Sequence, residues 1–97
     1  MNAIPLRSFG TSFASRERAR EVAAALSSAS TSPVTLDLSG ALLSPSFLSE
    51  ILLELAARFG SVTLTGCDQH TRGMIARIVP YLGLDSKVQV DEDVVRA

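Results

Sequence analysis

The stretch Val34-Thr-Leu-Asp-Leu-Ser-Gly-Ala-Leu-Leu-Ser-Pro-Ser-Phe47, with the apolar run that follows it to Phe59, decides the fold. Residues 34–38 alternate around a β-branched start, a pattern typical of a half-buried strand. Serines and one proline then mark a turn. From Phe47 onward the apolar residues recur at helical spacing and form one broad stripe. The segment therefore predicts a strand that ends near Asp37, a polar turn and an amphipathic helix.

Two further helices are predicted, one before and one after this segment. Residues 15–26 carry apolar side chains at helical spacing, and Ser15 is a suitable N-cap. Asp68 can cap the other helix, which Pro80 is expected to kink or end. The polar stretch 27–33 between the first helix and the strand is predicted to be a loop.

Three further strands complete the pattern. Residues 61–65 and 87–90 alternate between apolar and polar side chains, and a short edge strand is predicted within residues 4–9, because Pro5 cannot donate to a ladder. Strands that alternate with helices favour a mostly parallel sheet with right-handed crossovers. The predicted fold class is therefore α/β, with a mostly parallel four-stranded sheet and about three helices.

The composition favours one packed domain. The chain has 97 residues, of which 46% are hydrophobic and 20% charged, and two separate cores would each be too small to be stable. We therefore expect one domain over residues 1–97, with a C-terminal tail from about residue 91 that is prone to fraying. Only 5% of the residues are aromatic, so an aliphatic core is expected.

Charge and hydropathy exclude two classes of partner. The formal net charge is −1, whereas nucleic-acid binding depends on a basic excess that neutralises phosphates. The longest apolar runs fall short of the roughly 20 residues that cross a bilayer. The N-terminus lacks the basic and apolar regions of a signal peptide. We expect a cytoplasmic protein, with the bacterial cytoplasm as the default, and neither nucleic acid nor membrane as a partner.

Polar side chains gather at two predicted strand ends, where parallel sheets carry their functional groups. The first corner runs from Asp37 to Glu50. We interpret Asp37 as the start of an Asx-turn, with the positioning of a partner or a phosphate as the alternative. Ser44 and Pro45 suit the N-cap and the first helical position. Helix initiation leaves the side chains of Ser46, Phe47 and Ser49 unexplained.

The second corner runs from Thr65 to Arg72. Cys67 and His70 have a Cys-x-x-His spacing, but a structural zinc site needs four ligands and the chain holds no other Cys or His. Cys67 is interpreted as a small buried apolar residue, and His70 and Arg72 as a solvated helix start. No metal and no cofactor is expected.

Several of these runs occur together in a known family. They are Ser15-Arg-Glu-Arg-Ala-Arg20, Val34-Thr-Leu-Asp-Leu-Ser-Gly40, Ser44-Pro-Ser-Phe47 and Glu50 in the following helix. In this combination, residues 9–80 resemble the STAS-like domain family of unassigned function, and the resemblance implies a STAS-like sandwich. That family is similar to STAS domains, which include the anti-sigma-factor antagonists. The resemblance thus implies a regulatory protein that binds a kinase-type anti-sigma factor.

The resemblance also implies where a partner binds. Anti-sigma-factor antagonists are switched by phosphorylation of a serine at the helix start, and Ser46 is the nearest hydroxyl here. Their Asp-Ser-Ser-Gly run is replaced by Pro45-Ser-Phe-Leu48, which favours docking over phosphorylation. The residues expected to contact a partner are Asp37, Ser39, Ser44, Ser46, Phe47, Ser49 and Glu50.

Three functions are compatible with these observations. The leading hypothesis is a non-enzymatic interaction domain that docks a kinase-type ATPase or an anti-sigma-like protein. The second is a small-molecule or nucleotide-binding module that uses both corners, although no glycine-rich phosphate loop occurs. The third is an enzyme built on Cys67 and His70. Leu53, which falls off the main helical stripe, and Val94-Val95 favour a partner surface or a homodimer.

Overall fold

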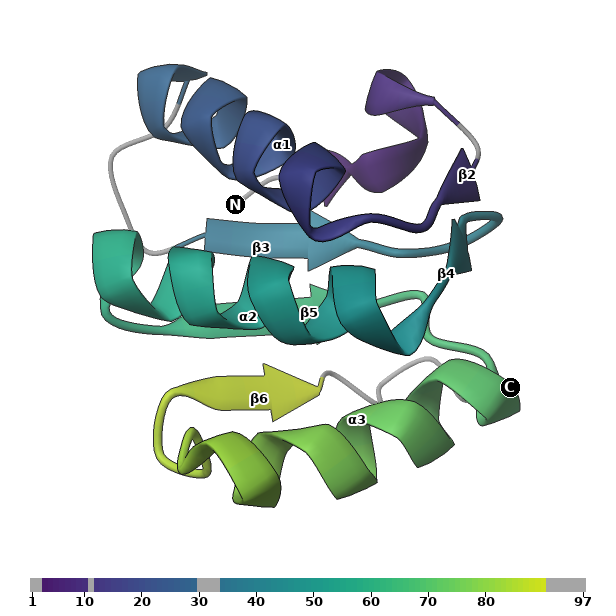
Figure 1. The fold of residues 1–97 in the computed structure, drawn as a ribbon, viewed down its shortest axis with the longest axis vertical. Coiled ribbons are helices and arrows are strands. Elements are labelled where there is room, and N and C mark those ends of the chain that lie inside the picture. The colour runs from purple at the N-terminus through teal and green to yellow at the C-terminus, as the bar shows by residue number, and fades with distance from the viewer. Residues whose placement is uncertain (1–2, 11, 30–33, 91–97) are drawn as a thin grey trace.

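A four-stranded parallel sheet forms one layer of the fold (Figure 1). The structure, a computed structural model, describes residues 3–10, 12–29 and 34–90. The strands, in their order across the sheet, are β1 (Ile4–Pro5), β3 (Val34–Asp37), β5 (Val62–Thr65) and β6 (Val88–Val90). Each neighbouring pair is parallel, which confirms the predicted α/β class with a four-stranded sheet.

Three helices form the second layer. They are α1 (Arg16–Ala29), α2 (Pro45–Phe59) and α3 (Gln69–Leu82), and all lie on the same face of the sheet (Figure 1). The shared face follows from the strand order, because strands that are consecutive neighbours with right-handed crossovers return each helix to the same side. Among the described residues, no helix is long and apolar enough to cross a lipid bilayer.

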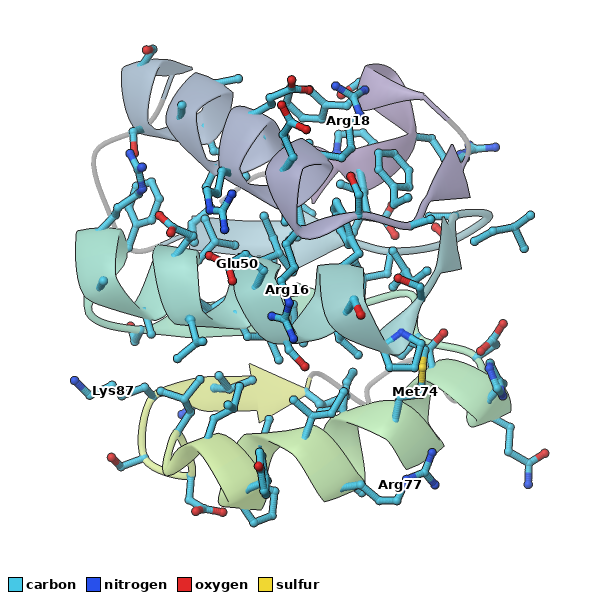
Figure 2. The ribbon with its side chains drawn as sticks, viewed as in Figure 1. Arg16, Arg18, Glu50, Met74, Arg77 and Lys87 are labelled. Carbon is cyan, nitrogen blue, oxygen red and sulfur yellow. The ribbon has the colours of Figure 1, made fainter. Side chains whose placement is uncertain are left out.

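The core lies between these layers. Alternate residues of the sheet, such as Leu36 and Leu64, are fully buried, and α2 contributes the largest buried stripe of the helices. The neighbouring Thr35, Thr63 and Gln89 lie in register on the other face and are half-buried or exposed. No helix in the described part of the chain covers that polar face. Charged side chains such as Arg77 and Lys87 extend from the outer surface (Figure 2).

The termini of the helices follow local signals in the sequence. Ser15 Oγ accepts from the Arg18 N–H at 3.0 Å, as an N-cap does. Ser44 caps α2, with Pro45 at its first helical position, and Asp68 caps α3. These three predicted caps are confirmed.

The predicted end of the first helix is wrong, and Pro80 does not end the third helix. The first helix continues through Ala29, so Ser27 and Ser28 are helical rather than part of a loop; the rest of that predicted loop lies outside the described residues. The third helix passes Pro80 and ends at Leu82. Pro80 removes one hydrogen bond in the last turn, and the Gly83 N–H bonds to the carbonyl oxygens of Pro80 and Val79, which closes the helix.

The predicted strands miss two features of the fold. The edge strand is limited to β1, because residues Leu6–Phe9 form the 3₁₀ helix η1. A second sheet pairs β2 (Ser12–Phe13) in parallel with β4 (Leu42–Leu43). Two-residue strands carry too little alternation to be recognised in a sequence. The predicted C-terminal tail from about residue 91, including Val94 and Val95, lies outside the described residues.

Candidate functional site

The first corner begins with a tight turn after β3. Asp37 Oδ1 accepts from the backbone N–H of Ser39 at 2.9 Å and from its hydroxyl at 2.5 Å. The Ala41 N–H then donates to the Leu38 carbonyl at 3.2 Å and closes the turn. The interpretation of Asp37 as an Asx-turn residue is confirmed, and its carboxylate is engaged within its own turn.

A short strand ties this turn to the N-terminal part of the chain. β4 pairs with β2, and the Ser44 N–H donates to the Phe13 carbonyl at 2.9 Å. The Ser44 hydroxyl donates to the Ala14 carbonyl at 2.8 Å and accepts from the Phe47 N–H at 3.0 Å. Ser44 therefore holds the N-terminus of α2 against the segment before α1, and its hydroxyl is already used in donating and accepting.

The first turn of α2 divides its side chains between solvent and core. Ser46 is exposed and Ser49 is half-buried. Phe47 is 0% exposed, and its ring lies 5.0 Å from that of Phe13, centroid to centroid. The expectation that Phe47 contacts a partner is corrected, because α2 turns this residue into the core against Phe13 of β2.

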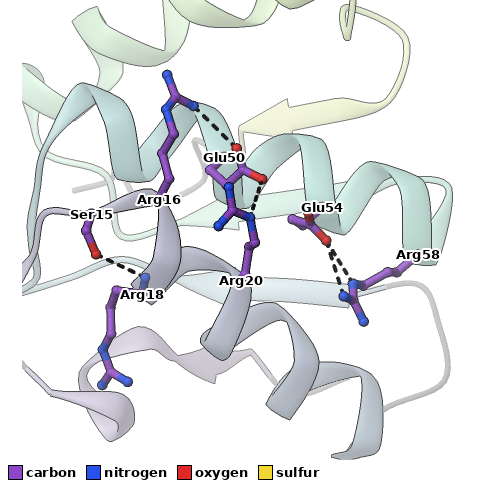
Figure 3. Close-up of polar contacts among 7 residues, drawn as sticks. All are labelled: Ser15, Arg16, Arg18, Arg20, Glu50, Glu54 and Arg58. Carbon is purple, nitrogen blue, oxygen red and sulfur yellow. Dashed lines mark hydrogen bonds and ion pairs between the residues drawn. The ribbon is translucent and has the colours of Figure 1, made fainter.

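Glu50 bridges α2 to α1. Its two carboxylate oxygens each lie 3.3 Å from an arginine nitrogen, Oε1 from Arg16 and Oε2 from Arg20 (Figure 3). The Glu50 side chain is 14% exposed, whereas both arginine side chains are more than half exposed. The two arginines thus engage the carboxylate and link α1 to α2. A partner contact of Glu50 stays a prediction.

The second corner is organised by the cap of α3. Asp68 Oδ1 accepts from the Thr71 N–H at 2.8 Å. This bond, and a second one from the Thr71 side chain, lowers the pKa of Asp68 below its ordinary value of 3.8. The nearby His70 acts in the same direction, while partial burial opposes it. Asp68 is therefore a carboxylate at neutral pH.

The cap gives a pH-dependent prediction. We expect Asp68→Ala to lower the free energy of unfolding by about 1 kcal/mol at pH 7, as measured by urea titration. Because the folded-state pKa lies below the unfolded value, the charged cap stabilises the fold above the unfolded pKa. This contribution is lost as the pH falls through the folded pKa. The difference between wild type and Asp68→Ala should therefore shrink below about pH 4; a pH-independent difference would contradict the assignment.

The two corners touch each other directly. The Leu38 N–H donates to the Thr65 carbonyl at 2.8 Å. Gly66 has φ +70°, and a Cβ at this position would lie 2.9 Å from the Ser39 nitrogen and closer still to the Asp37 carboxylate. The turn after β3 is therefore packed against the turn after β5, so the corners form one surface.

A hollow of about 280 Å³ opens where they meet. Leu42, Leu43 and Ser44 line it from the first corner, Asp68, His70 and Thr71 line it from the second, and Phe13 adds an aromatic wall. The Leu42 side chain is 71% exposed. The sequence prediction did not include Leu42 among the site residues. A Leu-Leu pair just before a helix cap was the available signal, since one of two consecutive strand residues must point outward.

Cys67 and His70 do not form a metal centre with other described residues. Within residues 3–10, 12–29 and 34–90, no three His, Cys, Asp or Glu side chains gather closely enough to hold a metal ion. Cys67 is half-buried rather than buried and packs at the edge of the core. His70 is exposed at the start of α3. The structure thus gives Cys67 a packing role.

Comparisons with known proteins add no relative. No protein-family model, no curated protein and no solved structure matches this chain. The resemblance to the STAS-like family therefore rests on the motifs within residues 9–80.

Proposed function

We propose that this chain is a non-enzymatic cytoplasmic interaction domain that docks a protein partner with the exposed part of the first corner. That surface consists of Ser39, Leu42 and Ser46, which lie on a turn, on β4 and on the first turn of α2. By the family resemblance, the partner is a kinase-type ATPase or an anti-sigma-like protein. Docking is proposed here without a phosphorylation switch, because Pro45 stands in place of the Asp of the antagonist motif and Leu48 in place of its small Gly.

The exposure of Leu42 carries this proposal. Its side chain is 71% exposed, while its backbone is held by pairing with β2 and by the hydrogen bonds of the neighbouring Ser44. Because the backbone is already ordered, binding has to order only the side chain, so much of the burial of Leu42 contributes to affinity. Full burial of a leucine contributes about 1.5–3 kcal/mol. Ser39 and Ser46 precede and follow Leu42 in the sequence, and both are exposed. Polar residues of this kind form the rim of protein interfaces.

The test compares two exposed leucines. Tagged wild-type chain, Leu42→Ser and Leu53→Ser are used for affinity capture from a lysate of the source organism, and retained proteins are identified by mass spectrometry. Leu53 is 39% exposed on α2 and does not line the hollow, so it is the matched control. We expect wild type and Leu53→Ser to capture an ATPase of the kinase class or an anti-sigma-like protein. With Leu42→Ser, its recovery should fall about tenfold.

Two results would contradict the proposal. One is equal recovery of every such protein with all three chains. The other is an equal loss of partner recovery with Leu42→Ser and with Leu53→Ser, which would indicate nonspecific binding by exposed leucines. Circular dichroism of each purified variant verifies that the chain used for capture is folded.

A further inference from the structure

The hollow between the corners combines apolar walls with a single charge. Phe13, Leu42 and Leu43 supply the apolar side, and Asp68 lies on the polar side. Among the described residues that line the hollow, Asp68 is the only one with a formal charge at pH 7, His70 being counted as neutral. The Ser44 hydroxyl is already bonded to Ala14 and Phe47, so Asp68 and His70 are the exposed polar side chains that can bind an incoming group.

Asp68 retains capacity for a further partner. Oδ1 accepts from the Thr71 N–H, and the Thr71 side chain donates a second bond to the carboxylate. A carboxylate nevertheless offers about four lone-pair sites on two oxygens. The residue is exposed as a whole, so a second donor can reach it from solvent. Helix capping therefore does not exhaust this group.

Size and charge decide which occupant fits. The volume of about 280 Å³ lies at the lower limit of small-molecule pockets, which span about 300–1,000 Å³. A nucleotide is larger and anionic, so Asp68 would repel its phosphates. An arginine side chain has an aliphatic stem for the leucines and a planar cation that binds carboxylates bidentately.

We propose that the hollow receives an arginine side chain of the protein partner, with its stem against Leu42, Leu43 and Phe13 and its guanidinium at Asp68. This inference rests on the proposed docking function and specifies the chemistry of the partner: a basic residue at the centre of its contact surface. Leu42 then has two roles: it contacts the partner surface directly, and it forms one wall of the hollow that receives the arginine.

The test uses a peptide and its neutral isostere. Capped Gly-Gly-Arg-Gly-Gly and the same peptide with citrulline in place of arginine are titrated into ¹⁵N-labelled protein, and amide shifts are followed by NMR. We expect the arginine peptide to shift the amides of Leu42, Leu43 and Thr71 with an affinity about threefold to fivefold higher than that of the citrulline peptide, as for an exposed charge pair. In Asp68→Asn, which keeps a good helix cap, the two affinities should become equal. Asp85→Asn, an exposed acid that does not line the hollow, should preserve the difference.

Three outcomes would overturn the inference. They are equal affinities of the two peptides in wild type, shifts confined to residues outside the hollow, and equal effects of Asp68→Asn and Asp85→Asn. A fourth arm uses n-propylguanidinium: if this free cation binds while the arginine peptide does not, the hollow accepts small molecules and the inference is wrong. The titration needs no partner protein. It can therefore fail while Leu42-dependent capture succeeds, and the reverse, so the two proposals are separable.

Discussion

Phe47→Ala is expected to lower the free energy of unfolding by about 3–5 kcal/mol. Phe47 is completely buried, and its ring packs against that of Phe13 with an interplanar angle of 48°. Truncation removes both the apolar transfer energy and the aromatic contact, and it leaves a cavity between the helix layer and β2. A 97-residue domain has a total stability of roughly 5–15 kcal/mol, so this variant should be close to unfolding.

Urea titration followed by circular dichroism measures this loss. Phe47→Leu, which keeps most of the volume, should be intermediate and remain folded at about 1–1.5 kcal/mol below wild type. Leu53→Ala, on the same helix but 39% exposed, should cost less than about 1 kcal/mol. If Phe47→Ala were as stable as Leu53→Ala, the burial of Phe47 would be contradicted, and Phe47 would again be a candidate for contact with a partner.

Gly66→Ala is expected to destabilise the fold by about 2–5 kcal/mol. A side chain at φ +70° costs about 1–2 kcal/mol by itself. The new Cβ would also press on the Ser39 backbone nitrogen and on the Asp37 carboxylate, which adds about 1–3 kcal/mol of overpacking. Part of the loss should appear as disorder of both corners, since the turns after β3 and β5 share this contact.

Gly60→Ala is the matched control for backbone strain. Gly60 has φ +79°, but no atom lies within 4 Å of a Cβ built there. It should therefore show the conformational cost alone, about 1–2 kcal/mol. Asp37→Ala combined with Gly66→Ala should cost less than the sum of the single changes, because removing the carboxylate relieves one of the clashes. Equal losses at Gly60 and Gly66 would contradict the packing of one turn against the other.

Side-chain burial and ion pairing change which residues of the first corner are available to a partner. Sequence reasoning identified the helix start and its cap but treated Phe47 and Glu50 as contact residues. In the fold, Phe47 faces Phe13 and Glu50 binds two arginines of α1. The exposed residues of the corner include Ser39, Leu42 and Ser46. Leu42 was missed because its exposure depends on the pairing of β4 with β2, residues about thirty positions apart.

Local chemistry was sufficient for the elements themselves. The alternation of Val34, Leu36, Val62 and Leu64 with threonines predicts strands with one apolar and one polar face, and the fold buries the apolar face under the helices. Caps at Ser15, Ser44 and Asp68 depend on a side chain and an N–H three residues later. Because such interactions act within a few residues, they can be predicted from the sequence.

The sequence by itself thus determined the α/β class, the succession of the four strands of the main sheet and the three α-helices, and the caps that begin those helices. Only the tertiary structure decided which side chains of the first corner meet solvent, and that both corners form one surface around a hollow. The physical reason is range: helix and strand periodicity depends on neighbours along the chain. The burial of Phe47, the engagement of Glu50, the exposure of Leu42 and the tight contact at Gly66 depend on segments that meet only when the sheet and its helices have packed.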